Sequence, residues 1–193
     1  SNLGYPAALD LALSKRRDEL HHVKIRGDLL FGPVHAAECD PSQEHFVYNT
    51  WHCSGYERRL CDRGLAFFEP MVFRNLEWYY KNYLTSNVCM ATVSGMDSEG
   101  YFYFGTSLGL SKCIADNSDI VIVEVNRNMP RIWGSDAVRI HISEVDHIVE
   151  SGDPPLYEVP NPAPNETDVK VANLVLPHIR DGATIQLGIG GMP

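Results

Sequence analysis

Three glycines near the end of the chain are the first candidates for ligand binding. The segment "QLGIGGMP" (186–193) places Gly188, Gly190 and Gly191 directly after an apolar run. Glycines at the end of a strand let the backbone pass close to a ligand, with amide groups free to point at an anion. The same residues also fit a tight turn between a strand and a helix, and they do not complete a G-x-G-x-x-G motif. Spacing alone leaves both interpretations open.

Two further segments place polar side chains at the ends of predicted strands. "YFYFGTSLGLSK" (101–112) puts Ser107 between a strand and a helix, where its hydroxyl either borders a pocket or caps the helix. "EVNRNMPRIWG" (124–134) carries Asn126 and Asn128 after the most strongly predicted strand. Ligands of open α/β sheets bind at the carboxyl ends of strands, so this loop is well placed for binding. A purely structural loop is the alternative.

No residue pattern indicates a metal site or an activated serine or cysteine. His35 and Cys39 lie four residues apart and His52 adjoins Cys53, but no further ligands complete a metal site. Residues 105–109 have the spacing G-x-S-x-G, but this spacing alone does not indicate an activated serine at Ser107. The five cysteines contain no C-x-x-C pair, which is typical of reduced thiols in a cytosolic protein.

Composition and charge narrow the class of protein. The chain has 193 residues, 44% of them hydrophobic and 21% charged, as in ordinary globular domains. Its net charge of −9 argues against a nucleic-acid partner, which would meet a basic face. No apolar run approaches the roughly 20 residues that span a bilayer. We therefore expect a cytoplasmic protein that acts on small molecules, with no membrane partner.

The elements that must position these segments alternate between helix and strand. Helices are predicted over 6–20, 55–64, 75–84 and 107–117. Strands are predicted over 22–30, 45–52, 87–96, 101–105 and 119–126, with another inside 138–150 and a hairpin-like turn at 97–100. This alternation predicts an open, layered α/β domain.

A proline-rich segment divides the chain. "SGDPPLYEVPNPAPNE" holds five prolines in sixteen residues and indicates an extended linker. We expect a first domain over 1–150, a linker over 151–165 and the start of a second domain over 166–193. The second domain would begin with an amphipathic helix, interrupted at Pro177, and a strand over 183–189.

Taken in order, five segments resemble the acetyl-CoA hydrolase/transferase family, which includes 4-hydroxybutyrate, butyrate and acetate CoA-transferases. The resemblance covers nearly the whole chain. It is carried by "GYPAALDLALSKRRDEL", "GYFYFGTSLGLSK", "DIVIVEVNRNMPRIWG", "IHISEVDHIVE" and "DGATIQLGIGGMP".

The resemblance implies two similar open α/β domains with the active site between them. It also implies a glutamate nucleophile that forms an acyl-glutamyl anhydride and then a glutamyl-CoA thioester, dividing one difficult transfer into easier steps. In the family this glutamate lies in the second domain, downstream of the glycine turn. No catalytic residue is therefore assigned here, and neither Glu124 nor Glu144 is promoted to that role.

The resemblance also suggests binding residues and partners. Gly188, Ile189, Gly190, Gly191 and Met192 would lie against CoA, and Gln186 would lie near the substrate. Ser107, Asn126 and Asn128 would form the first domain's side of the cleft. Coenzyme A or acyl-CoA would be a substrate, with no permanently bound cofactor. Small carboxylic acids, the remaining C-terminal domain and further copies in a homo-oligomer would be the partners.

Three alternatives remain open at this point. A hydrolase of the same family would pass the acyl group to water. A nucleotide-binding Rossmann-like module would lack acyl chemistry. A non-catalytic dimerisation domain is suggested only by the aromatic residues over 67–84.

Overall fold

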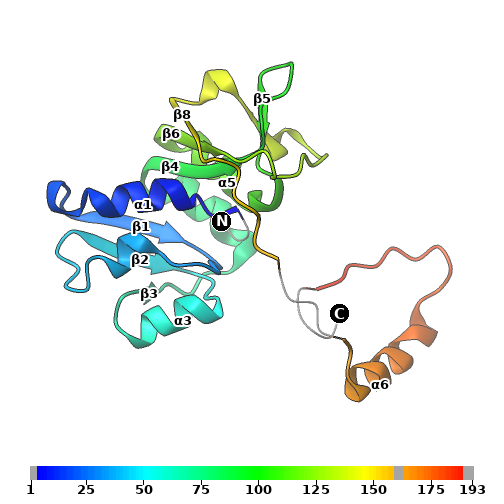
Figure 1. Cartoon of the computed structure of the whole chain (residues 1–193). Coiled ribbons are helices and arrows are strands. Elements are labelled where there is room, and N and C mark those ends of the chain that lie inside the picture. The colour runs from blue at the N-terminus through cyan, green and yellow to red at the C-terminus, as the bar shows by residue number, and fades with distance from the viewer. Residues whose placement is uncertain (1–3, 159–162, 189–193) are drawn as a thin grey trace. The chain divides into compact units, whose positions relative to one another are not determined.

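The chain forms two units. The computed structural model describes residues 4–158 and 163–188. The first unit is Ser1–Tyr157 and the second is Glu158–Pro193, and each is described by itself (Figure 1). The proline-rich segment contains the boundary between them.

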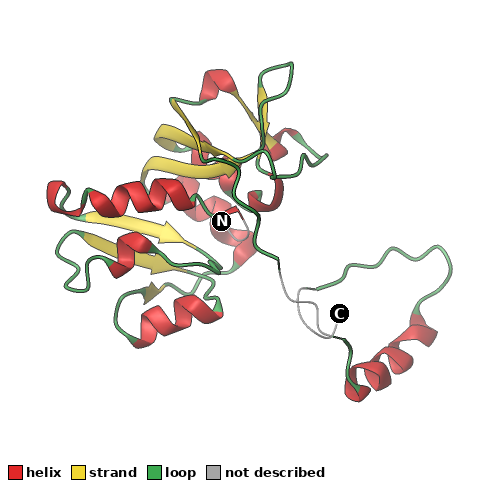
Figure 2. Cartoon of the chain, in the orientation of Figure 1, coloured by secondary structure: helices red, strands yellow, loops and turns green. Residues whose placement is uncertain are grey.

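Helices and strands alternate through the first unit, as the sequence predicts (Figure 2). Its helices are α1 (Ala7–Lys15), α2 (His35–Glu38), α3 (Gly55–Asp62), α4 (Leu76–Asn82) and α5 (Ser111–Asp116). Its strands are β1 (Val23–Gly27), β2 (Phe46–Thr50), β3 (Phe67–Phe68), β4 (Ser86–Val93), β5 (Tyr101–Tyr103), β6 (Ser118–Val125), β7 (Arg139–His141) and β8 (His147–Glu150). Short 3-10 turns at Arg17–Glu19, Phe73–Asn75, Gly105–Ser107, Asp136–Val138 and Ile142–Glu144 complete it.

The strands form two parallel sheets and one small antiparallel pair. The parallel sheets have the orders β1-β2-β3 and β4-β6-β8, and β5 pairs with β7. Parallel neighbours need crossover connections. Those of β1–β2, β2–β3 and β4–β6 contain α2, α3 and α5, whereas the β6–β8 connection contains β7 and two 3-10 turns. The predicted open α/β architecture is confirmed.

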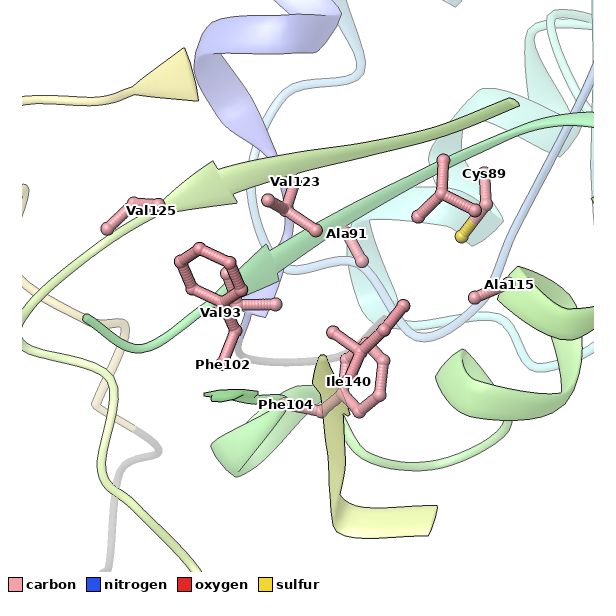
Figure 3. Close-up of a cluster of buried hydrophobic side chains, with 10 residues drawn as sticks. Cys89, Ala91, Val93, Phe102, Phe104, Ala115, Val123, Val125 and Ile140 are labelled. Carbon is pink, nitrogen blue, oxygen red and sulfur yellow. The ribbon is translucent and has the colours of Figure 1, made fainter. Parts of the chain in front are cut away.

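The longest strands pair along their most apolar stretches. In β4 and β6, Ala91 lies opposite Val123 and Val93 lies opposite Val125, so their side chains share one face. These side chains are buried together with Phe102, Phe104 and Ile140. Figure 3 shows the cluster, which joins the parallel sheet to the β5–β7 pair. The carboxyl ends of β4 and β6 are therefore anchored by the main core of the first unit.

Buried carboxylates fix the first two helices. Glu124 on β6 accepts a 3.0 Å hydrogen bond from the backbone amide of Leu9, in the first turn of α1. Asp10 of α1 in turn accepts from the amides of His35 and Ala36 at the start of α2, at 2.6 and 3.2 Å. Helix N-termini carry unpaired amides and a partial positive charge. Each carboxylate accepts hydrogen bonds from those amides and places a negative charge beside the positive end of the helix. Glu124 therefore has a structural partner in this fold.

One prediction about strand pairing is confirmed and one is incomplete. The hairpin-like turn at 97–100 is formed, with the amides of Asp97 and Ser94 donating to the carbonyls of Tyr101 and Tyr103 at 2.9 and 2.8 Å, and β5 also pairs with β7. The single strand expected within 138–150 is two strands, β7 and β8, which belong to different sheets. Between them, His141 and Glu144 form a capping box that turns the chain. Pairing between residues 25 apart, as in β6–β8, or 36 to 40 apart, as in β5–β7, is not visible in a local sequence pattern.

The second unit contains helix α6 (Glu166–Val175) followed by a 3-10 turn at Leu176–His178. Asn165 caps α6 by accepting from the amides of Thr167 and Asp168, and Pro177 lies where the helix tightens, as expected. The predicted strand over 183–189 is not formed in the described residues 183–188, because no described segment pairs with that backbone. No described helix is long and apolar enough to cross a membrane.

Candidate functional site

A cavity of about 740 Å³ lies at the carboxyl ends of the β4-β6-β8 sheet. Its buried floor is formed by Ser94, Phe102, Val125 and Met129. Its more exposed walls are formed by Gly95, Met96, Arg127, Arg131, Ile148 and Glu150. Pockets of this size and position are the usual ligand sites of parallel α/β sheets.

The wall at the end of β8 is held by an ion-pair network around Arg127. The guanidinium of Arg127 lies 2.9 Å from a carboxylate oxygen of Glu150 and 3.0 Å from one of Asp153. The backbone amide of Arg127 also donates to Asp153 at 2.6 Å. These bonds hold the pKa of Asp153 below its ordinary value, with the backbone bond as the largest cause. Gly152 and Asp153 both have positive φ, which turns the chain back toward β6.

The predicted residues Asn126 and Asn128 bind backbone beside the cavity. Buried Asn126 donates through Nδ2 to the carbonyl of Pro154 at 2.9 Å and accepts at Oδ1 from the amide of Asn128 at 2.9 Å. Asn128 donates through Nδ2 to the carbonyl of Asp153 at 2.8 Å. Neither side chain is among those that line the cavity. In the structure, both fasten the start of the proline-rich segment to the end of β6.

A close contact joins the Gly-Thr-Ser and Asn-Met-Pro segments. Gly105 has φ +52°, and a Cβ placed there would lie 2.5 Å from the sulfur of Met129 and 2.7 Å from the carbonyl oxygen of Pro130. Thr106 donates to the same sulfur from its amide at 3.3 Å and from its hydroxyl at 3.2 Å. The absence of a side chain at Gly105 therefore lets Met129 settle into the cavity floor.

Ser107 lies on the far side of this contact. Its hydroxyl is buried, has no hydrogen-bond partner among the described residues and does not line the cavity. A Cβ on Gly4 would lie 1.5 Å from that hydroxyl oxygen, so the chain passes directly over Ser107. Segments that are distant in the sequence, at Gly4, Ser107 and Met129, thus meet beside one end of the sheet.

The predicted CoA-contacting turn lies mostly outside the described residues. Ile189, Gly190, Gly191 and Met192 are not among them. Gln186 and Gly188 belong to the second unit, where both are exposed, and Gln186 donates only to the adjacent carbonyl of Leu187. Their role in binding stays a prediction.

The other reactive side chains have structural surroundings. Glu144 accepts from Lys112 at 2.7 Å, and this contact lowers its pKa. Cys53 and Cys61 line a smaller cavity of about 430 Å³ beside α3, and burial raises the pKa of Cys53 to about 11. A thiol with a raised pKa is a poor nucleophile at neutral pH. The described residues include no group of three or more His, Cys, Asp or Glu side chains placed to hold a metal ion.

The sequence identifies the 126–131 loop but not most of the cavity. Ser94 in the floor and the wall residues Gly95, Met96, Ile148 and Glu150 are not among the predicted site residues. Only their position in the sequence could have identified them, because each group lies at or next to the end of a predicted strand. The pairing of β8 beside β6, which brings them together, is not predicted either.

Comparisons with known proteins agree with this fold. Residues 2–159 match the acetyl-CoA hydrolase/transferase N-terminal domain. The chain is 42% identical over 190 residues to the butyryl-CoA:acetate CoA-transferase of Anaerostipes caccae, covering 97% of this chain and 43% of that protein. It is 33% identical over 192 residues to the 4-hydroxybutyrate coenzyme A transferase of Clostridium kluyveri, covering 99% of this chain and 44% of that protein.

Solved structures give the same result. The crystal structure of RipA from Yersinia pestis matches with a TM-score of 0.88 and 29% identity, covering all of this chain and 46% of that one. The 4-hydroxybutyrate CoA-transferase of Porphyromonas gingivalis matches with a TM-score of 0.79 and 27% identity, covering all of this chain and 43% of that one.

These matches decide against a Rossmann-like nucleotide-binding module. They also show that the chain spans less than half the length of the relatives it matches. The fold, the order of the quoted segments and the match over residues 2–159 lead to one conclusion: the chain belongs to the acetyl-CoA hydrolase/transferase family.

Proposed function

We propose that this chain supplies the N-terminal domain of a CoA-transferase, which moves CoA between an acyl-CoA and a small carboxylic acid. The observation that carries the proposal is the cavity at the carboxyl ends of β4, β6 and β8, formed by the family-like loops. The names of the relatives support the reaction class, since they are CoA-transferases with butyryl, acetate and 4-hydroxybutyrate substrates.

In this proposal the first unit binds and orients substrate. The family resemblance places the nucleophilic glutamate in the second domain, and covalent catalysis by that carboxylate would proceed through an anhydride and a thioester. The glycines at 188–191 would bring backbone amides close to CoA. Asn126 and Asn128 act as positioning residues, because their hydrogen bonds fix the loop beside the cavity, and Ser107 packs against Gly4. The 193-residue chain alone is expected to have no transferase activity.

A chimera tests the proposal. The matched 190 residues of the Anaerostipes caccae enzyme are replaced by this chain, and CoA transfer from butyryl-CoA to acetate is measured. We expect acetyl-CoA to form only when acetate is present. The control is a chimera carrying Gly105→Val, which we expect to be inactive because the new side chain would meet Met129 and Pro130.

The same assay distinguishes the hydrolase alternative. Release of free CoA at equal rates with and without acetate would identify water as the acceptor. A folded chimera with neither activity would contradict the proposed function.

A further inference from the structure

The two arginines on the cavity wall differ in what they already bind. The guanidinium of Arg127 is engaged by the carboxylates of Glu150 and Asp153, both within 3.0 Å. Arg131 makes no ion pair within 4.0 Å among the described residues. Its one hydrogen bond is a long one, 3.4 Å to the carbonyl of Met96, and its guanidinium lies 5.7 Å from the ring centroid of Tyr103. Arg131 therefore retains most of its donor capacity.

The carboxylate of Asp97 feels the charge of Arg131, but its hydrogen bonds come from other groups. Asp97 accepts from the amides of Glu99 and Tyr101 at 3.0 and 2.9 Å, and from the hydroxyl of Tyr103 at 2.9 Å. These donors, with the Tyr101 amide as the largest cause, hold the pKa of Asp97 below its ordinary value. The carboxylate is satisfied without Arg131.

The floor of the cavity offers an apolar surface. Phe102, Val125 and Met129 form its floor with Ser94. The Ser94 hydroxyl is occupied, since it donates to the carbonyl of Gly95 at 2.9 Å and accepts from the amide of Tyr103 at 3.1 Å. Arg127 and Glu150 on the wall neutralise each other at 2.9 Å. One available guanidinium beside an apolar floor suits a ligand with one anionic head and an alkyl chain.

We propose that Arg131 binds the carboxylate of the small acid that accepts CoA, with the acid's alkyl chain against Phe102, Val125 and Met129. This assignment rests on the proposed transferase function and names the residue that selects the acceptor. A planar guanidinium can hold a carboxylate through two parallel hydrogen bonds, which an ammonium group cannot reproduce.

The test is a titration of the 193-residue chain, labelled at its methionine methyl groups, with sodium acetate and sodium butyrate at constant ionic strength. Met96 and Met129 line the cavity and report binding there, whereas Met71 and Met90 lie outside the lining and serve as internal controls. Butyrate should shift the methyl resonances of Met96 and Met129 and leave those of Met71 and Met90 unchanged. Each buried methylene strengthens binding about fourfold, so the two extra methylenes of butyrate should make it bind roughly fifteen times more tightly than acetate.

Substitutions at Arg131 and at Arg74 distinguish the loss of the Arg131 charge from an unspecific effect of removing any arginine. Arg131→Gln should weaken butyrate binding by at least about tenfold, because a charge-assisted pair is lost, and Arg131→Lys should recover only part of that loss. Arg74→Gln, which removes the same charge from an exposed position outside the cavity, should leave binding unchanged. Uncharged butyramide should not bind.

Two results would overturn the assignment. One is butyrate binding that Arg131→Gln leaves intact. The other is tighter, Arg131-dependent binding of adenosine 3′,5′-bisphosphate at Met96 and Met129, which would make this a phosphate site. The chimera assay separates the two proposals. Transfer without methyl shifts rejects only this site, whereas butyrate binding without transfer rejects the proposed function and shows that Arg131 holds a carboxylate that does not accept CoA.

Discussion

At the scale of single residues, Gly105 is the position where backbone conformation and packing coincide. Its φ of +52° is in the left-handed region, and both Met129 and the Pro130 carbonyl occupy the space of a side chain. Gly109 offers a matched comparison, because its φ of +32° is also positive but a Cβ added there would meet nothing within 4 Å. The two glycines separate the cost of conformation from the cost of contact.

We expect Gly105→Ala to destabilise the chain by about 1–3 kcal/mol more than Gly109→Ala. Both variants carry a similar conformational penalty of roughly 1–2 kcal/mol, so the difference reports the collision with Met129 and Pro130. Urea unfolding of the two variants measures it. Equal losses would show that Met129 can move aside and that the close contact does not shape the cavity floor.

At the scale of elements, α1 is tied to α2 through one buried carboxylate. Asp10 is 4% exposed and accepts from two amides at the start of α2. We expect Asp10→Ala to lower the free energy of unfolding by about 1–3 kcal/mol, because two amides lose their acceptor. Asp18→Ala is the control: its side chain is 82% exposed and its ion pair with Arg17 lies on the surface, so a loss below about 0.5 kcal/mol is expected. Equal losses of unfolding free energy in the two variants would show that Asp10 does not connect α1 to α2.

Glu124 gives the connection between β6 and α1 a pH dependence. Burial raises its pKa above the ordinary value of 4.5, although the amides of Leu9 and Ala8 partly offset this. A carboxyl whose folded-state pKa is raised favours the folded state most at low pH, and that contribution is lost as pH rises from the unfolded pKa through the folded one. We therefore expect the stability of Glu124→Gln, relative to the unmodified chain, to increase from pH 4 upward and then level off. Chemical denaturation of both proteins across that range measures the difference. A relative stability that falls with pH would mean that ionised Glu124 is favoured by the α1 amides.

Most elements are predictable from sequence because their signals are local. β6 is a continuous β-branched run, and α3 begins at the Ser54–Glu57 capping box and ends before Gly64, which has φ +72°. The β5–β7 pairing and the insertion of β8 beside β6 are not predictable in this way, because they depend on contacts distant in sequence. Most of the cavity cannot be predicted from the sequence for the same reason. The loop carrying Arg131 is identifiable from its residues, but the wall at Ile148 and Glu150 exists only through the β6–β8 pairing.

At the scale of the whole molecule, the two units differ in how much each buries. The first contains the clusters around Val93, Leu60 and Leu76. The second contains a ten-residue helix, α6, with no buried residue, and Leu174 and Leu176 are 74% and 58% exposed. An isolated helix of this length is marginal in water, because most helical stability in proteins comes from packing of an apolar face.

We expect this difference to appear in hydrogen exchange. Amides of β4 and β6 should exchange only through unfolding of the first unit, whereas amides of α6 should exchange by local opening, with protection lower by about two orders of magnitude or more. Measurement on the 193-residue chain at neutral pH, resolved by peptide, gives the comparison. In the active chimera, where the rest of a CoA-transferase is present, protection of 166–175 should rise toward that of β6. If α6 is equally protected in both proteins, then its apolar side chains already have partners in this chain, and the second unit is more complete than its exposed leucines indicate.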